Sequence, residues 1–363
     1  MTRTTCSLPT ALLILMSLAV PALAESQGEV EEVRQHTEKQ EAPEKEPEGF
    51  TLTAGNKTLT ISGVLEVEAS YTDTSGSPAE SDLNVATAQL NFDAAVSDRV
   101  KGRIALLHEE GEEPTVDIDE AYISYSQPEI LGGSLKGTAG KVYLPFGTFN
   151  SAMVSDPLTL ELGETNRTTL LAGWENDMVT VQMGGFDGDY STTDHNEIDN
   201  GVIGVTVSPT DTIKFGISYI SDLAETNAEL LGDASSDYES SVDAASAFVT
   251  LDFSPLTVNL EYLGALDKFS EEMLADPDHA EELTGRKPSA WFAEIGFAPN
   301  DDWLFSCRFE QATDYQDDVV RYGATVSYAL YDYTTLSLEY LYSDPDLAEN
   351  TTTQVTAQLA LEF

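Results

Sequence analysis

The feature that most constrains this chain is an alternation of apolar and polar residues with a period of two. It is clear in 213–219, IKFGISY, in 256–262, LTVNLEY, and in 354–363, QVTAQLALEF. Successive side chains of a β-strand point to opposite faces, so the pattern predicts strands with one apolar face. The predicted strands are 58–72, 83–96, 99–110, 117–127, 134–143, 166–175, 177–187, 198–208, 211–222, 242–254, 255–266, 287–298, 302–312, 318–330, 332–343 and 351–363.

The connections between these runs alternate strictly between short and long. The longer ones are 73–82, 111–116, 144–165, 188–197, 223–241, 267–286, 313–317 and 344–350. An even strand number, with tight turns at one rim and long loops at the other, is typical of a bacterial outer-membrane barrel. A soluble β-sandwich or β-helix is the alternative, but there is no domain linker after residue 50 and no fixed repeat. We predict an all-β, transmembrane, antiparallel up-and-down β-barrel of about 16 strands over residues 50–363.

The first residues have the features of a signal peptide. Arg3 precedes the apolar stretch 11–20, and Ala22-Leu23-Ala24 fits the small-residue cleavage pattern. We therefore expect residues 1–24 to be removed on export, with an uncleaved anchor as the alternative. Residues 25–49 are charged and nearly free of apolar groups, which predicts an acidic, disordered periplasmic tail. These features predict location in the outer membrane of a Gram-negative bacterium.

The charge balance is strongly acidic: 64 Asp and Glu residues against 17 Lys and Arg, a formal net charge of −47. Phosphates need a basic surface, so nucleic acid is excluded as a partner. The acids either form a solvated, repulsive surface or favour cationic solutes and divalent cations. The four histidines are scattered, and Cys307 is the only cysteine after the signal. We expect no enzyme activity, no cofactor and no metal site.

The longest interruption of the alternation is 144–165, which contains Pro145 and Pro157. It joins the fifth and sixth predicted strands and is therefore the third long loop. In sixteen-stranded porins the third loop folds into the barrel and narrows it, so we expect 144–165 to fold inward. An ordinary exposed loop is the alternative. Apolar side chains would seat the loop on the wall and acids would face the pore. The candidate constriction residues are Phe146, Phe149, Asp156, Glu161 and Glu164.

Strand parity points five basic residues into the lumen: Arg103, Arg167, Lys214, Arg308 and Arg321. Opposite the acids of the loop, these bases would create a transverse field that orients dipolar solutes and sorts ions. In the alternative arrangement they pair with acids of the lumen and limit repulsion. Candidate partners are Glu66, Glu261, Glu310 and Glu339. The two arrangements can coexist.

A family resemblance rests on several short motifs. They are Gly140-Lys141-Val142-Tyr143-Leu144-Pro145-Phe146-Gly147, Ser155-Asp156-Pro157-Leu158-Thr159, Glu164-Thr165, Ala172-Gly173-Trp174 and Leu361-Glu362-Phe363. Together they make residues 50–363 similar to the LbtU-like siderophore porin family of Gram-negative bacteria. The resemblance implies an outer-membrane barrel that takes part in ferric-siderophore uptake without an energy-coupled plug.

The sequence thus predicts a porin for passive uptake of small solutes, with a ferric siderophore as the cargo that the resemblance implies. The alternative is a non-transporting structural or adhesive barrel that displays its acidic loops 223–241 and 267–286. Expected partners are outer-membrane lipids and lipopolysaccharide, the solute or siderophore, and the barrel-insertion machinery, which would recognise Phe363. Sixteen-stranded porins are often trimers, so a homotrimer is compatible with the sequence.

Overall fold

The computed structural model describes residues 49–110, 116–188, 198–231, 241–269, 284–345 and 350–363. The predicted signal peptide, and the predicted tail up to residue 48, lie outside the described residues. The barrel belongs to the structural unit Lys45–Phe363. None of the helices in the described part of the chain is long and apolar enough to cross a bilayer.

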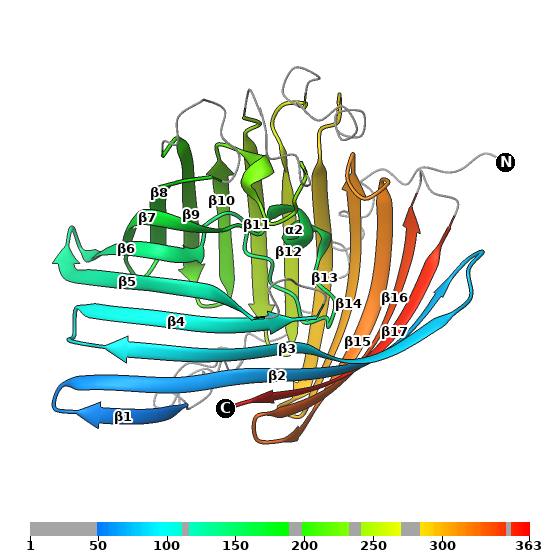
Figure 1. Ribbon diagram of the computed structural model, residues 1–363, viewed down its shortest axis with the longest axis horizontal. Coiled ribbons are helices and arrows are strands. Elements are labelled where there is room, and N and C mark those ends of the chain that lie inside the picture. Colours follow the sequence, from blue (N-terminus) through cyan, green and yellow to red (C-terminus); the bar gives the residue numbers. More distant parts are fainter. Residues whose placement is uncertain (1–48, 111–115, 189–197, 232–240, 270–283, 346–349) are drawn as a thin grey trace, which may run out of the picture. The chain divides into compact units, whose positions relative to one another are not determined.

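Seventeen strands form one antiparallel sheet (Figure 1). They are β1 (Phe50–Ala54), β2 (Lys57–Thr74), β3 (Glu80–Ala95), β4 (Val100–Glu109), β5 (Asp117–Ile130), β6 (Gly133–Tyr143), β7 (Asn166–Glu175), β8 (Val179–Phe186), β9 (Asn200–Thr210), β10 (Ile213–Ile220), β11 (Ala244–Phe253), β12 (Leu256–Ala265), β13 (Ser289–Asn300), β14 (Trp303–Thr313), β15 (Val319–Tyr331), β16 (Thr334–Pro345) and β17 (Thr352–Glu362). From β2 to β17 each strand pairs with the next in sequence, and β17 pairs with β2. These sixteen strands therefore close into a barrel.

The predicted strands agree with β2–β17, and every predicted boundary lies within three residues of the observed one. The prediction missed β1, which pairs with Lys57–Ile61 to form a hairpin with β2. β17 pairs with the other part of β2, Val64–Thr74. Between them, Gly63 N–H donates to the Phe363 carbonyl at 2.8 Å and Phe363 N–H returns the bond at 3.0 Å. Thus β1 continues the line of β17 and extends the pairing of β2.

Burial within the strands is inverted relative to a soluble protein. In β14, Phe305 and Phe309 are each 42% exposed, whereas Ser306, Arg308 and Glu310 are at most 2% exposed. A strand with apolar residues outward and polar residues inward fits a barrel whose outer surface meets lipid. The alternation therefore has the sense expected for a membrane barrel and not for a sandwich.

A buried apolar cluster occupies the end of the barrel at which the long loops lie. The wall contributes residues near strand ends, and the loops contribute others. Its members include Val142, Phe186, Val202, Ile220, Leu263 and Ala290 from strands, and Phe146, Leu158, Leu162, Leu223, Leu231 and Phe269 from loops. Burying a side chain of this size stabilises a fold by about 1.5–3 kcal/mol. Apolar burial thus holds the long loops against the barrel.

Candidate pore constriction

The loop 144–165 crosses the barrel from β6 to the opposite wall. In a closed ring of sixteen strands, β14 is eight strands from β6 in either direction. Leu158 N–H donates to Glu310 of β14 at 2.8 Å, and Val154 N–H donates to Glu339 of β16 at 2.6 Å. The loop therefore reaches strands that lie across the lumen from its own start.

Two features of the sequence PFGTF turn the chain inward after β6. Gly147 has φ +82°, a conformation that L side chains rarely adopt. A Cβ atom at this position would also lie 2.3 Å from the ring of Phe149. Gly147 N–H donates to Ser218 Oγ of β10 at 3.0 Å. Phe146 is 1% exposed and belongs to the buried apolar cluster, so the turn is fixed by both backbone geometry and burial.

The loop ends in a short helix, α2 (Leu158–Gly163), which the sequence did not predict. Leu158 and Leu162 are fully buried, and α2 lies against β12, β13 and β14 (Figure 1). At Gly163 an added Cβ would lie 2.1 Å from a methyl carbon of Leu263 in β12. The absence of a side chain at this position allows α2 to approach the wall closely.

Two glutamates of the wall accept hydrogen bonds from backbone N–H groups in the first half of the loop. Glu261 of β12 accepts from Thr148 N–H at 2.7 Å and from Phe149 N–H at 2.9 Å. Glu294 of β13 accepts from Ala152 N–H, also at 2.7 Å. Glu261 is 4% exposed and Glu294 is 1% exposed. These acids satisfy N–H groups that the irregular chain would otherwise leave unpaired in a buried position.

Glu310 and Glu339 accept hydrogen bonds from backbone N–H groups in the second half of the loop. Glu310 is the acceptor for Leu158 N–H described above and is fully buried. Glu339 accepts from Val154, from Ser155 N–H at 3.1 Å, and from the hydroxyl of Thr325 at 2.7 Å. We call Glu261, Glu294, Glu310 and Glu339 the glutamate seat. It extends over β12, β13, β14 and β16.

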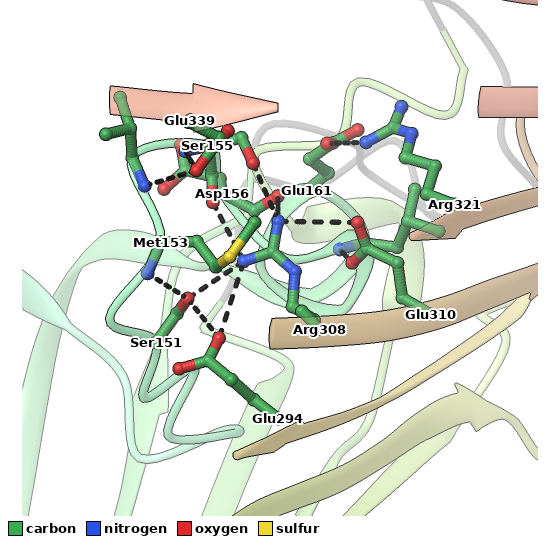
Figure 2. A network of polar contacts seen from close by, with 12 residues as sticks. Ser151, Met153, Ser155, Asp156, Glu161, Glu294, Arg308, Glu310, Arg321 and Glu339 are labelled. Atoms are coloured by element: carbon green, nitrogen blue, oxygen red, sulfur yellow. Dashed lines mark hydrogen bonds and ion pairs between the residues drawn. The ribbon is translucent and has the colours of Figure 1, made fainter. Parts of the chain in front are cut away.

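Arg308 of β14 is the basic centre of the glutamate seat, and its side chain is fully buried (Figure 2). It donates to the loop through Ser151 Oγ and the Ser155 carbonyl at 2.8 Å, Ser155 Oγ at 2.9 Å and the Asp156 carbonyl at 3.0 Å. It also donates to Glu310 at 3.3 Å and lies 3.9 Å from Glu294. Arg308 therefore joins the loop to two acids of the wall.

Arg321 of β15 forms a direct ion pair with the loop acid Glu161 (Figure 2). Glu161 also accepts from the side-chain amide of Gln316, and its backbone carbonyl accepts from Tyr315 Oη at 3.0 Å. Arg308, in contrast, meets the carbonyl of Asp156 and not its carboxylate. On this wall Arg321 therefore pairs with an acid of the loop, whereas Arg308 contacts wall acids and the backbone of the loop.

The other three predicted basic residues lie elsewhere. Arg103 of β4 is 2.8 Å from Glu120 and 3.8 Å from Asp93, both on neighbouring strands. Arg167 of β7 is 3.6 Å from Glu225, which lies in the 3₁₀ helix η2 (Leu223–Glu225). Lys214 is exposed near the short-turn end of β10. None of these contacts involves the loop acids Asp156 and Glu161.

The remaining loop acids differ in their surroundings. Asp156 is exposed to the lumen solvent. Glu164 follows α2 and accepts from Asn227 Nδ2 at 3.2 Å. Burial raises the pKa of Glu164 from 4.5 to about 7, and the charge of Asp156 adds to the shift. Glu164 therefore titrates near neutral pH, in contrast to an ordinary surface carboxyl group.

The sequence reasoning gave Glu294 no role and treated the other seat glutamates only as partners for bases. Their main partners are backbone N–H groups of the loop, which no side-chain pattern reveals. A signal was nevertheless present. Aligning the predicted strands places Glu294 beside Arg308, Glu310 beside Arg321, and Glu339 beside Thr325. Several charged residues side by side on one inner face need further hydrogen-bond partners if they are buried. Such a group therefore indicates that another segment of the chain covers it.

Comparison with curated proteins finds relatives without a functional name. The chain is 26% identical over 255 residues to the UPF0422 protein of Coxiella burnetii, a match over 66% of this chain and 53% of that protein. It is 27% identical over 143 residues to the UPF0422 protein lpg2959 of Legionella pneumophila, over 37% of this chain and 27% of the relative. The chain thus spans about half, or less, of the length of these relatives. No family model matches.

Solved structures with the same fold include outer-membrane channels and porins. The outer membrane channel DcaP of Acinetobacter baumannii aligns with a TM-score of 0.63 at 10% identity, over 87% of this chain and 99% of that one. Salmonella typhi OmpF aligns at 0.61 with 12% identity, over 86% and 100%. An anion-selective porin from Comamonas acidovorans aligns at 0.60 with 11% identity, over 85% and 100%. The chain therefore has a porin-like outer-membrane channel fold.

Proposed function

We propose that this chain is a passive diffusion channel of the Gram-negative outer membrane, with a bore divided by the loop 144–165. One observation carries the proposal: the loop reaches across a closed sixteen-strand barrel and is hydrogen-bonded to the wall at Glu261, Glu294, Glu310 and Glu339. An aqueous lumen is expected at this strand number, and inward residues then set what passes.

A structural or adhesive barrel is the weaker alternative. It requires the loops 223–241 and 267–286 to be displayed. The described beginnings of these loops are buried instead: Leu223 and Phe269 are fully buried and Leu231 is 2% exposed. The segments 232–240 and 270–283 lie outside the described residues. A role as an enzyme has less support still, because the solved channels share the fold and the buried polar residues serve the loop.

The cargo belongs to the same proposal. Small hydrophilic solutes are the general class for a passive pore, and a ferric siderophore is the cargo that the resemblance to LbtU-like porins implies. A ferric siderophore is larger than a small hydrophilic solute, so it needs a wider opening beside the loop. A siderophore channel should support growth on that ferric siderophore and should lose this ability when a bulky cross-link closes the bore.

The expected partners follow from the location. Lipids and lipopolysaccharide would contact the exposed apolar faces of the strands, and the barrel-insertion machinery would recognise the terminal strand with Phe363, which is 50% exposed. A signal peptide over 1–24 would deliver the chain to the periplasm. A homotrimer is a suitable assembly for a porin of this size, and cross-linking in outer-membrane fractions tests it.

Planar-bilayer recording tests the function directly. The refolded barrel, verified by heat-modifiable gel mobility, should give discrete single-channel steps. Deletion of 149–162 removes most of the crossing segment and should raise the conductance severalfold. A folded barrel without steps contradicts the channel. Steps of unchanged size after the deletion contradict the constriction.

A further inference from the structure

We propose that the passage beside the loop prefers cations, and that Asp156, with Glu66 and Glu68 of β2, sets this preference. The inference rests on the proposed channel function and names the class of solute that such a channel favours: inorganic and small organic cations. The fold alone does not decide the sign of selectivity, because an anion-selective porin shares it. The sign must come from the charges that face the passage.

The basic groups of this wall are neutralised by contacts or lie away from the loop. The side chain of Arg308 has no solvent exposure, and its two Nη atoms donate to the loop and to Glu310 of the glutamate seat. Arg321 is paired with Glu161. Lys214 lies four residues from Ser218, the contact of the loop in β10, and is therefore about 13 Å further along the strand. Neither arginine beside the loop is free to attract an anion.

Asp156 is an exposed acid of the loop. Arg308 binds its carbonyl oxygen, so the carboxylate points elsewhere and is exposed. Within the described residues, this carboxylate has no hydrogen bond or ion pair. Enclosure by the barrel raises the pKa of Asp156, the charges of Glu161, Glu66 and Glu68 raise it further, and the charge of Arg308 opposes them. Asp156 follows Ser155, which donates to Glu339 of β16, and one strand, β17, separates β16 from β2, where Glu66 and Glu68 lie. Their fields therefore add in this part of the bore.

Two further acids lie on β2, which β17 separates from β16 and its loop contact Glu339. Glu66 and Glu68 belong to β2, where both are partly exposed. Glu68 accepts from Gln358 Nε2 at 2.9 Å, a neutral donor that leaves its charge uncompensated. Further round the wall, Arg103 is shared between Asp93 and Glu120, so this cluster also has an excess of acid. The passage thus has acids on the loop and on the wall that faces it.

The preference for cations is measured as a reversal potential across a bilayer with a tenfold KCl gradient. We expect a potassium-to-chloride permeability ratio above one in the native channel. Asp156→Asn should lower this ratio about threefold, and Asp156→Lys should bring it to one or below. The combination of Glu66→Gln with Glu68→Gln should act in the same direction. Asp98→Asn, in the exposed turn between β3 and β4, is the control and should change nothing.

The outcomes separate the two proposals. A folded barrel without conductance overturns the proposed function. A conducting channel with a permeability ratio at or below one overturns the cation preference but leaves the channel intact. A ratio above one that is insensitive to Asp156→Lys and to the double Glu66 and Glu68 substitution overturns the assignment to these residues. Heat-modifiable mobility of each variant verifies that the barrel has formed.

Discussion

The two sides of the barrel wall carry the same kind of residue and use it differently. On β12–β16, Glu261, Glu294, Glu310 and Glu339 are buried and accept hydrogen bonds from the loop. On β2–β5, the inward acids Glu68, Asp93 and Glu120 are partly exposed and meet side chains of neighbouring strands. An example is Glu120, which pairs with the partly exposed Arg103.

The difference shows that an acid on an inner face is not by itself a pore charge. On β12–β16 the carboxylate oxygens accept the hydrogen bonds that backbone N–H groups of the loop would otherwise make to water. The role of these acids is therefore structural. On the other side the acids remain available to mobile ions. The covering loop, and not the residue type, decides which task a glutamate performs.

The largest effect is expected from the buried base. Arg308→Ala leaves Glu294 and Glu310 without their cation and removes four hydrogen bonds that Arg308 donates to the loop. Loss of one partner of a buried ion pair costs about 3–5 kcal/mol. Arg103→Ala removes the same charge from the opposite side, where the pair is partly exposed, and should cost at most about 1 kcal/mol. Urea unfolding in detergent or lipid, followed by tryptophan fluorescence, measures both. Equal losses would contradict the distinction between the two sides.

The next largest loss of stability is expected from replacing a single glutamate of the glutamate seat. Glu339→Gln places an amide where three donors converge, so at least one N–H or O–H group loses its acceptor. The expected cost is about 1–3 kcal/mol. Glu66→Gln makes the same chemical change at a partly exposed position and should stay within about 0.5 kcal/mol of the native barrel. The same unfolding measurement applies, and a stable Glu339→Gln variant would argue against the seat.

A smaller effect is expected where the loop turns inward. Gly147→Ala places a side chain at φ +82° and against the ring of Phe149, so it should destabilise by about 1 kcal/mol or more. Gly137→Ala is the matched control, because a Cβ there meets nothing within 4 Å. Single-channel recording should also show noisier current for Gly147→Ala. Identical behaviour of the two variants would show that the turn does not depend on this glycine.

The smallest expected effect is a change of stability with pH that depends on Glu164. The pKa of Glu164 rises from 4.5 to about 7 in the folded protein. The folded state therefore disfavours the charged form, and this residue destabilises the barrel increasingly as pH rises from 4.5 to 7. Glu164→Gln should match the native barrel near pH 4 and exceed it in stability at pH 8. A difference between the two that does not change with pH would refute the shift.

Much of the fold was predictable from the sequence because a barrel wall is built from local rules. Alternation defines each strand, and the lengths of the connections define the two rims. The exception was β1, whose five residues are too few for a periodic pattern to stand out. The constriction was harder to predict. Phe146 is buried, and the attachment of the loop depends on backbone N–H groups, which every sequence has. Likewise, Asp156 meets Arg308 through its carbonyl oxygen, which the sequence could not indicate.

The attachment of the loop at Glu310, on the strand opposite its origin, has a mechanical consequence. A thin-walled cylinder flattens easily under lateral pressure, because bending its wall costs little. A segment attached to the wall at two opposite points resists flattening of the cylinder along the line that joins those points. The segment that divides the lumen therefore also braces the barrel against the lateral pressure of the bilayer. Its removal should leave a wall that changes its cross-section more readily as the lipid composition changes.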